Sequence, residues 1–398
     1  MVLRNIDCLI IGAGPTGLTL GIGLLRTGRS VLIAEKHETR LPFSKALLIN
    51  SNSLAELSNY VDINEFVHNA ILINGVTLSV AGFAETTANF SETLPSLTHP
   101  LSLPQETTES ILRATFLERG GQLLSGYSFD SSVDDLSNYS SGVIREIHLR
   151  SNSGIPVTVQ CTWLFGCDGA HSEVRKALHL EFPGSSDREL LHVIDATVEE
   201  WPFSSTFFVS LGFTETRGAI QIITSPLTVR IIGNSRQACK SMLRSFRVRS
   251  ILWDGSFSNS YRVVSSYGRG NVWLAGDAAH VHSPLGGRGM NMGIHEALVL
   301  ADAVGSMEVR SYERRCRPAA QRWVRFNYLL THLLLGHGRL WTLLRAGLVV
   351  VLVLLLKVVG ARLLKYMFEK LALVHVTLRG KVTKKETSRQ MEEVKSEG

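Results

Sequence analysis

One motif near the start of the chain limits the fold more than any other, the glycine-rich segment GAGPTG at residues 12–17. The apolar run 6–11 before it predicts a buried strand, and residues 18–27 after it predict a helix. A second predicted strand, 30–34, leads to an acidic residue, Glu35. Strand, glycine turn and helix in this order form a unit that binds dinucleotides, because the glycines permit a tight turn and bring backbone N–H groups close to a pyrophosphate. The predicted contacts are Gly12, Gly14, Gly17 and Glu35.

Glu35 also indicates which dinucleotide fits. A carboxylate at this position accepts hydrogen bonds from the ribose hydroxyls, and its charge repels a 2′-phosphate. The sequence therefore predicts a site for FAD or NAD rather than NADP. A glycine turn without a ligand is the alternative, and the strand, helix and acidic residue around the motif argue against it.

A second segment, LFGCDGAHSEVR at residues 164–175, runs from apolar residues into an Asp-Gly turn and then into a helix that begins near Ser172. The turn presents the carboxylate of Asp168 and the backbone of Gly169 at one place, with Arg175 later in the segment. Taken alone, the segment is better explained by an ordinary strand–turn–helix in which Ser172 is the N-cap.

The third segment is LAGDAAHVHSPLGGRGMNMG at residues 274–293. A predicted buried strand, 271–275, leads directly to Asp277, whose carboxylate can hold a ribityl or ribose hydroxyl. The glycines that follow expose N–H groups at the start of a helix predicted over 289–304, and such an arrangement stabilises an anion. The length and order of this segment make a generic glycine loop a poor explanation.

Together these three segments resemble the class A flavin-dependent monooxygenases, which have the para-hydroxybenzoate hydroxylase fold. The segments occur in that family's order and approximate spacing, and the resemblance covers residues 5–325. Two shorter matches agree with it, Pro104-Gln105 with Thr108-Glu109, and Tyr312–Arg315 with Pro318. The resemblance implies an α/β fold in which a Rossmann-like FAD-binding domain is interleaved with a β-sheet substrate domain and followed by a C-terminal helical region.

The domain boundaries follow from the resemblance and from local composition. Residues 182–262 are rich in Val, Ile, Phe and Thr, which favours a sheet, and Phe207, Phe208, Trp253 and Phe257 could supply the wall of a substrate pocket. The predicted FAD-binding domain comprises residues 1–70, 101–181 and 263–309, the substrate-binding domain 71–100 and 182–262, the C-terminal helices 310–378, and a disordered tail 379–398.

The resemblance also implies roles for individual residues. The ADP half of FAD would lie on the first glycine motif and Glu35, Asp277 would hold the ribityl chain, and Pro284 would line the front of the flavin. Asp168, Gly169 and Arg175 resemble a motif tied to both FAD and NAD(P)H. The other implied cofactor contacts are Lys45, Gln105, Arg113, Gly287, Gly289, Met290 and Asn291.

The implied reaction uses NADPH or NADH, FAD and O₂. The nicotinamide gives a hydride to FAD, O₂ adds at flavin C4a, and the resulting hydroperoxide hydroxylates or epoxidises an aromatic or polyketide-like molecule. A helix N-terminus beside the reduced flavin would stabilise its negative charge, and a closed apolar pocket would keep water away. The catalytic base is unassigned, with Lys45 and His282 as the candidates, and no metal site is predicted.

Several positions depart from the family's pattern. Lys45 stands where the family usually has Arg, which removes a planar, bidentate donor, and Glu296 stands where it usually has Asp. The stretches 300–312 and 231–253 are shorter than expected. A lapsed or shortened flavoprotein that acts as a membrane-tethered binder, or a flavin reductase on the same fold, is therefore the alternative function.

The charge of the chain is divided between two regions. The net charge is +6, but residues 1–309 hold 23 Lys/Arg and 29 Asp/Glu, whereas residues 310–398 hold 18 and 6. Because the three motifs lie in the acidic region, a nucleic-acid partner is not expected.

The basic region contains an apolar segment, 346–361, interrupted by Lys357. Three interpretations stay open: a buried or homodimer-contacting helix, a helix on a membrane surface, and a membrane span. No signal peptide is expected. Five cysteines without metal spacing favour a reducing compartment, so the predicted location is cytoplasmic, with membrane association through residues 340–365 as an open addition.

Overall fold

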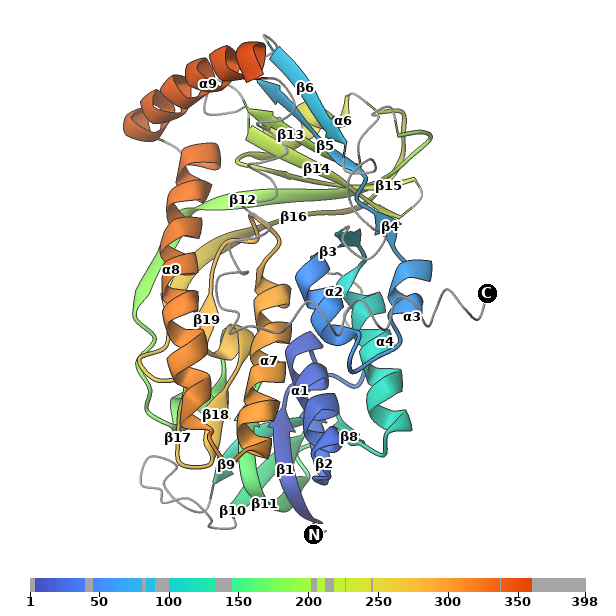
Figure 1. The fold of residues 1–398 in the computed structure, drawn as a ribbon, viewed down its shortest axis with the longest axis vertical. Helices are drawn as coiled ribbons and strands as arrows, with labels where there is room; N and C mark the ends of the chain where they lie inside the picture. The colour runs from blue at the N-terminus through green and yellow to red at the C-terminus, as the bar shows by residue number, and fades with distance from the viewer. Residues whose placement is uncertain are drawn as a thin grey trace, which may run out of the picture.

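The computed structural model describes residues 4–39, 46–80, 84–89, 100–132, 145–201, 206–211, 218–225, 227–244, 246–336 and 338–359. Two large sheets lie at opposite ends of the long axis, and helix α8 runs along one side from the first toward the second (Figure 1). The mixed α/β fold predicted from the sequence is confirmed.

The first sheet has the strand order β17-β18-β11-β1-β2-β8. At its centre β1 (Arg4–Ile11) lies parallel to and between β11 (Pro156–Gly166) and β2 (Val31–Glu35). Residues 8–11 of β1 and 31–34 of β2 are continuous apolar runs, as expected for parallel strands covered on both faces. The remaining strands are β8 (Gln122–Ser125), β9 (Tyr127–Ser132), β10 (Arg145–Ser151), β17 (Gly268–Arg269) and β18 (Val272–Leu274). The strands predicted over 6–11, 30–34 and 271–275 are confirmed.

Helices α1 (Pro15–Arg26), α4 (Gln105–Glu118) and α7 (Gly289–Gly305) pack beside this sheet (Figure 1). Helix α1 lies against α7 so closely that a Cβ at Gly23 would stand 2.6 Å from the Cβ of Ala301, which only glycine permits. The predicted helix within 18–27 is therefore confirmed, and it begins earlier because Pro15 occupies its first turn.

The second sheet has the order β19-β16-β12-β15-β14-β13-β5-β6. Its two long strands, β12 (Gly184–Val198) and β16 (Val248–Val263), pair antiparallel. The other strands are β5 (Gly75–Val80), β6 (Ala84–Asn89), β13 (Phe207–Leu211), β14 (Gly218–Ser225), β15 (Thr228–Gly233) and β19 (His280–Val281). The sheet predicted within 182–262 is confirmed.

The prediction for this region missed one helix, α6 (Arg236–Leu243). The side chain of Ser235 accepts a hydrogen bond from the N–H of Ala238 at 3.1 Å and so caps the helix. Cys239 and Leu243 of α6 pack on Ile194 of the sheet. The helix covers one face of the sheet, which leaves the other face toward the rest of the molecule.

Short elements connect the two sheets. Strand β7 (Leu101–Ser102) pairs with both β3 (Leu48–Ile49) and β4 (Ile71–Leu72). The short helices are α2 (Ser51–Leu57), α3 (Ile63–His68) and α5 (Glu173–Ala177), and a 3₁₀ turn, η2, spans Gly276–Ala278. Because β7 comes shortly before α4 in the chain, this three-stranded sheet places the start of α4 near β3 and β4.

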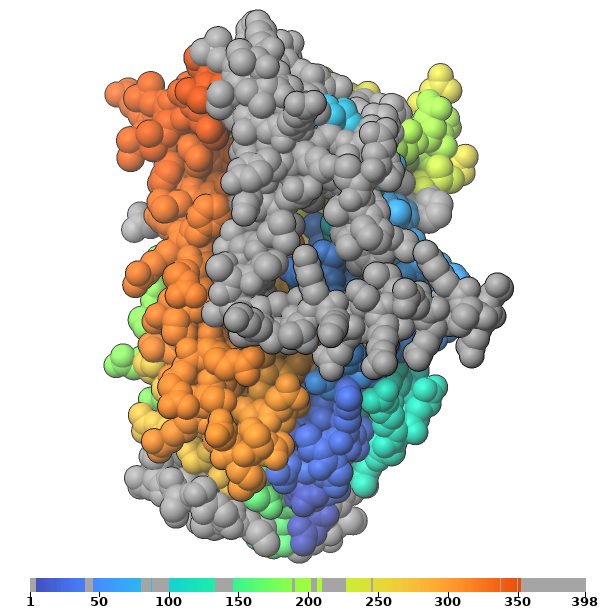
Figure 2. Space-filling model, viewed as in Figure 1, coloured from blue at the N-terminus to red at the C-terminus, as the bar shows by residue number. Residues whose placement is uncertain are grey.

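The C-terminal region is helical over α8 (Arg310–Leu335) and α9 (Arg339–Val359), as predicted. Helix α8 forms one side of the molecule in the space-filling view (Figure 2). Arg345 of α9 is fully buried and donates hydrogen bonds to the carbonyls of Leu333 and Gly336 at the end of α8. Among the residues that the structure describes, no helix meets the length and hydropathy of a membrane span. The predicted tail 379–398 and the end of the apolar segment lie outside the described residues.

Candidate active site

The first glycine motif forms the turn between β1 and α1. Gly12 has φ +105°, and a Cβ there would overlap the carbonyl oxygen of Cys167. A Cβ at Gly17 would overlap the carbonyl oxygen of Gly12. Gly14 differs, because no atom lies within 4 Å of the position that a Cβ would take there. Two glycines thus serve packing, whereas Gly14 borders open space that a phosphate group could enter.

Glu35 lies at the end of β2, next to this turn. Its Oε2 accepts a hydrogen bond from the N–H of Ala13 at 2.8 Å, and its Oε1 accepts one from the N–H of His37 at 2.9 Å. Each carboxylate oxygen carries more than one acceptor site. The carboxylate is therefore held in place beside the turn and still has lone pairs for ribose hydroxyls.

Asp168 follows β11 and caps the short helix α5. Its Oδ2 accepts hydrogen bonds from the N–H groups of Glu173 at 2.7 Å and Val174 at 3.3 Å. Burial raises the pKa of this carboxyl group, although the N–H donors oppose the shift. Gly169 next to it has φ +81°. The geometry makes Asp168 a cap in the scaffold, and Ser172 also caps the helix by accepting from the N–H of Arg175 at 3.0 Å.

Arg175 connects the second segment to the third. Its guanidinium donates to the carbonyl of Ala278 at 2.8 Å and to that of Ala170 at 2.8 Å. The side chain is 6% exposed and lies over the ring of Phe182, 3.9 Å from its centroid. One of these carbonyls is 103 residues away in the sequence, so the residue acts as an internal strut between the two segments.

Asp277 lies in η2, directly after β18. It is exposed, whereas Gly276 and Ala278 on either side are buried. Gly276 has φ +61°, and a Cβ there would lie 2.6 Å from Oγ1 of Thr16 in α1. Thr16 belongs to the first glycine motif, so the carboxylate of Asp277 opens to solvent beside the N-terminus of α1.

A buried polar cluster contacts the backbone shortly after β18. Glu296 of α7 accepts hydrogen bonds from the N–H of Gly276 at 3.0 Å and from the hydroxyl of Tyr267 at 2.9 Å, and its Oε2 lies 2.9 Å from Nε2 of His280. Burial opposes charge on both partners, but their attraction outweighs it and raises the pKa of His280 and lowers that of Glu296. Glu296, which stands where the family usually has Asp, therefore joins Gly276, Tyr267 and His280 in one buried cluster.

His282, a candidate base, is occupied by other contacts. Its Nδ1 lies 2.8 Å from the carbonyl oxygen of Ser283, and its Nε2 accepts a hydrogen bond from the indole N–H of Trp323 at 3.2 Å. Burial lowers its pKa to about 4. Arg288 stacks on Trp323 at 4.3 Å, and burial lowers its pKa to about 10. This geometry leaves neither nitrogen of His282 to accept a substrate proton, so its candidacy as a base is not supported.

Asn291 fastens the start of α7 to β3. Its Nδ2 donates to the carbonyls of Leu48 at 2.8 Å and Gly287 at 2.7 Å, and its Oδ1 accepts from the N–H of Asn50 at 2.9 Å. Gly287 has φ +59° and lies against Leu48. The predicted stretch from Gly287 to Asn291, with Gly289 and Met290, thus forms the first turn of α7 and the loop before it. The side chain of Asn291 shapes this loop.

The other predicted cofactor contacts lie on or near α4. Gln105 begins α4, accepts from the N–H of Ala46 at 3.2 Å and donates to Glu109 at 2.8 Å. Arg113, two turns later, donates to the hydroxyl of Ser125 at 3.2 Å. Lys45 lies outside the described residues, so its role as a cofactor contact or base stays a prediction.

The strand pairing decides which residues of the second sheet face this region. Ile194 of β12 packs on α6, so Leu191 and Asp195, at odd numbers along the strand, lie on the opposite face. Leu191 packs with Leu285, which follows Pro284 in the third segment. The face opposite α6 is therefore the one that meets the Gly-Asp segment.

Three of the four predicted wall residues lie on that face. Trp253 pairs with Asp195, Phe257 pairs with Leu191, and Phe207 joins them through the register of β13, β14 and β15. The prediction for Phe208 is wrong, because alternation along β13 turns its side chain to the face that carries α6.

A buried ion pair on the same face was missed by the sequence-based prediction. Arg230 donates to both carboxylate oxygens of Asp195, at 2.7 and 2.6 Å, and lies over the ring of Trp253 at 5.9 Å. Arg230 is only 4% exposed. No local signal announces such a pair, because its members are 35 residues apart on neighbouring strands.

The sequence matches a family of known proteins. The model of the FAD binding domain family matches residues 5–239 and 234–327. The chain belongs to this family. Its cofactor is therefore FAD, and the turn at Gly14, the carboxylate of Glu35 and the exposed Asp277 are suited to hold it. Within the described residues, no cluster of His, Cys, Asp and Glu could hold a metal ion.

Curated relatives of this FAD-binding protein are oxygenases by name. The 12-dehydrotetracycline 5-monooxygenase/anhydrotetracycline 6-monooxygenase of Streptomyces rimosus is 28% identical over 325 residues, which cover 75% of this chain and 62% of the relative. The pentachlorophenol 4-monooxygenase of Sphingobium chlorophenolicum is 28% identical, with 83% and 65% covered. The chain thus spans slightly less than two thirds of the length of these relatives.

Solved structures agree on the fold. The anhydrotetracycline hydroxylase OxyS from Streptomyces rimosus superposes with a TM-score of 0.73 at 25% identity, covering 93% of this chain and 76% of that one. The p-nitrophenol 4-monooxygenase from Pseudomonas putida superposes with a TM-score of 0.77 at 18% identity, covering 93% and 99%. Because the second structure is only 18% identical, its similarity shows the fold alone.

Proposed function

We propose that this protein is an FAD-dependent monooxygenase that uses NAD(P)H and O₂ to hydroxylate an aromatic or polyketide-like molecule. The observation that carries the proposal is the junction at Thr16. Its hydroxyl lies against both Gly276 and Gly293, so the phosphate-binding turn, the exposed Asp277 and the start of α7 meet at one place. The names of the curated relatives support the reaction and the substrate class.

Each group at this junction has a proposed task. The N-terminus of α1 and the open space at Gly14 would receive the pyrophosphate, and Glu35 the ribose. Asp277 would accept a ribityl hydroxyl. The first turn of α7, held by Asn291, would stabilise negative charge on the flavin ring through its N–H groups and dipole. When bound, FAD supplies the acceptance of a hydride and the activation of O₂.

The second sheet would supply the substrate wall. Phe207, Trp253 and Phe257 offer apolar and aromatic surface on the face that meets the Gly-Asp segment. Arg230 is already neutralised by Asp195, which favours a neutral aromatic substrate over a carboxylate. We infer that these residues exclude water from the reacting atoms.

Absorption spectroscopy and oxygen uptake test this proposal. The purified protein, loaded with FAD, should show a flavin spectrum, become bleached by NADPH or NADH without oxygen, and consume O₂ faster when a phenol is added. Bleaching without substrate-stimulated product formation would favour the flavin reductase. A protein that binds FAD and is reduced by neither nicotinamide would favour the lapsed flavoprotein.

We also propose that α9 contacts a membrane surface. Five of its apolar side chains are 48–71% exposed: Leu340, Leu343, Leu344, Val350 and Val351. The helix contains no acidic residue, and Arg339 at its start is exposed, so anionic lipid suits it better than neutral lipid. Binding to vesicles with phosphatidylserine, reduced by Leu343→Gln, would support the proposal, whereas concentration-dependent dimerisation without vesicle binding would replace it by self-association.

A further inference from the structure

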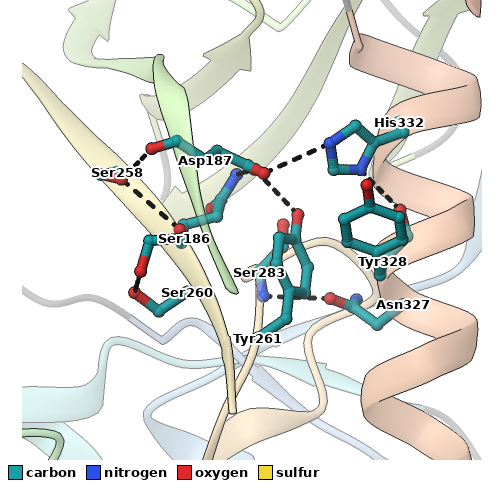
Figure 3. A network of polar contacts seen from close by, with 10 residues as sticks. Ser186, Asp187, Ser258, Ser260, Tyr261, Ser283, Asn327, Tyr328 and His332 are labelled. Carbon is teal, nitrogen blue, oxygen red and sulfur yellow. Dashed lines mark hydrogen bonds and ion pairs between the residues drawn. The ribbon is translucent and has the colours of Figure 1, made fainter. Parts of the chain in front are cut away.

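The backbone around Pro284 is held by one buried amide side chain. Asn327 of α8 is 0% exposed. Its Oδ1 accepts a hydrogen bond from the N–H of Ser283 at 3.0 Å (Figure 3). Its Nδ2 donates to the carbonyl of Leu285 at 2.7 Å. The two bonds lie on either side of Pro284, which has no N–H of its own. A single side chain therefore fixes both flanks of the residue expected to face the flavin.

Further contacts fasten the same short loop to the same helix. Oγ of Ser283 accepts from the N–H of Leu285 at 3.3 Å, which closes a tight turn over Pro284. Trp323, one turn before Asn327, donates to His282, and His282 contacts the carbonyl of Ser283. The loop from His282 to Leu285 is thus attached to one face of α8 on both sides of the proline.

Helix α8 continues from this loop to the second sheet. Directly after Asn327, Tyr328 lies edge-on to Tyr261 of β16, with ring centroids 5.1 Å apart. Nε2 of His332 lies 3.2 Å from Oδ1 of Asp187 in β12, and the hydroxyl of Tyr261 donates to Oδ2 of Asp187 at 3.1 Å (Figure 3). Consecutive turns of α8 therefore hold the Pro284 loop and the two long strands in one frame.

The chemistry of this clamp needs an amide. Ser283 presents a donor and Leu285 an acceptor, and Asn supplies the matching acceptor and donor in one planar group. An ionised carboxylate would keep only the acceptor, and an alkyl side chain of the same shape would keep neither. Since Asn327 is buried, a lost partner would leave an unpaired polar group without water.

We propose that Asn327 is a positioning residue, which sets the place of Pro284 relative to the flavin ring by clamping the backbone on both of its sides. The effect of Asn327 on the reaction rests on the proposed function. The clamp itself does not depend on that function. Asn327 touches neither substrate nor cofactor and acts only through the loop.

The first experiment measures hydrogen–deuterium exchange in the FAD-free protein. In Asn327→Leu, backbone amides within residues 282–288 should exchange about tenfold faster than in the wild type, because two bonds to the loop are lost. The control is Val324→Ala, which removes buried apolar volume from the same helix and, like the wild-type valine, has no side-chain hydrogen bond to lose. Unchanged exchange in Asn327→Leu, or equal acceleration in Val324→Ala, would overturn the clamp.

The second experiment uses the FAD-loaded protein and Asn327→Asp. Near pH 8 the carboxylate cannot donate to Leu285, so flavin fluorescence should differ from that of the wild type and less product should form per NAD(P)H consumed. Burial at this position raises the pKa of the introduced carboxyl, so as the pH falls through that pKa the protonated carboxyl regains the donor, and the difference in fluorescence should shrink. A difference that does not depend on pH would contradict the proposal, and this variant also decides the matter if Asn327→Leu does not fold. If the wild type oxidises no NAD(P)H, the proposed function fails, while the exchange experiment still decides the clamp.

Discussion

Asp168 and Asp277 look alike in the sequence, but the structure uses them in opposite ways. Each adjoins a glycine directly after a buried strand of the first sheet. Asp168 turns inward, caps α5 through two backbone N–H groups and has a raised pKa because of burial. Asp277 is exposed between buried neighbours. The difference shows that a carboxylate after a strand is not by itself a ligand-binding group.

The two residues differ in which backbone N–H groups near them need an acceptor. After Asp168 the chain enters a helix whose first N–H groups need an acceptor, and the carboxylate supplies it. After the second strand, Glu296 supplies the internal carboxylate by accepting from the N–H of Gly276. The N–H of Gly276 therefore does not need Asp277 as its acceptor.

The largest expected effect concerns this internal carboxylate. Glu296→Leu should destabilise the protein by about 3–5 kcal/mol, because it leaves His280 without its buried partner and the N–H of Gly276 without an acceptor. Urea unfolding measures the loss. Glu296→Gln keeps an acceptor for Gly276 and should cost less; equal costs for both variants would show that the charge, not the hydrogen bonds, dominates.

Asp277→Ala should separate ligand binding from stability. Loss of a charge-assisted hydrogen bond should weaken FAD binding about 10- to 100-fold, while the free energy of unfolding of the FAD-free protein should change by less than about 0.5 kcal/mol. Fluorescence titration with FAD and urea unfolding check the two parts. A large loss of stability would erase the contrast with Asp168.

Asp168→Ala should do the reverse. Removal of the cap of α5 should cost about 1–2 kcal/mol of stability in the FAD-free protein. Asp168→Asn should retain most of that stability, because a neutral amide oxygen can also accept the two N–H bonds and burial already disfavours the charged form. Thermal unfolding of both variants measures this, and equal losses in Ala and Asn would contradict it.

The smallest effect is a pH dependence of the His280–Glu296 pair. The folded-state pKa of His280 lies above its ordinary value of 6.5 despite burial, because Glu296 favours the charged ring. Its contribution to stability is thus complete below pH 6.5 and falls as the pH rises through the folded-state pKa. The difference in unfolding free energy between the wild type and His280→Asn should shrink over that range, and a difference that grows would refute the ion pair.

Local pattern was sufficient to predict most of the first sheet and its helices. The strands around Ile10 and Ile33 are continuous apolar runs, and α7 begins at Gly289, as predicted. Helix α6 was missed because its residues follow a long stretch of strand-forming composition, and its signal is mainly the cap at Ser235. Phe208 was assigned to the wrong face because the register of β13 is set by neighbouring strands rather than by its own residues.

The candidate site was predictable in outline but not in the tasks of its side chains. Arg175 and Asn291 were expected to meet the cofactor, yet their hydrogen bonds reach backbone groups 103, 241 and 243 residues away. Asn327 bonds with groups 42 and 44 residues away and had no sequence signal. Side-chain to backbone bonds over such separations depend on tertiary packing, which periodicity does not report.

The open space at Gly14 distinguishes what a working flavoprotein must keep from what a lapsed one could lose. Gly12 and Gly17 are required by contacts inside the protein, so any descendant with this fold would retain them whether or not it bound a cofactor. At Gly14 the backbone has φ −70° and no neighbour within reach of a Cβ, so folding alone would accept almost any residue. A side chain there would be opposed only by a ligand, so Gly14 is the glycine of this motif at which a substitution would obstruct the cofactor and leave the fold intact.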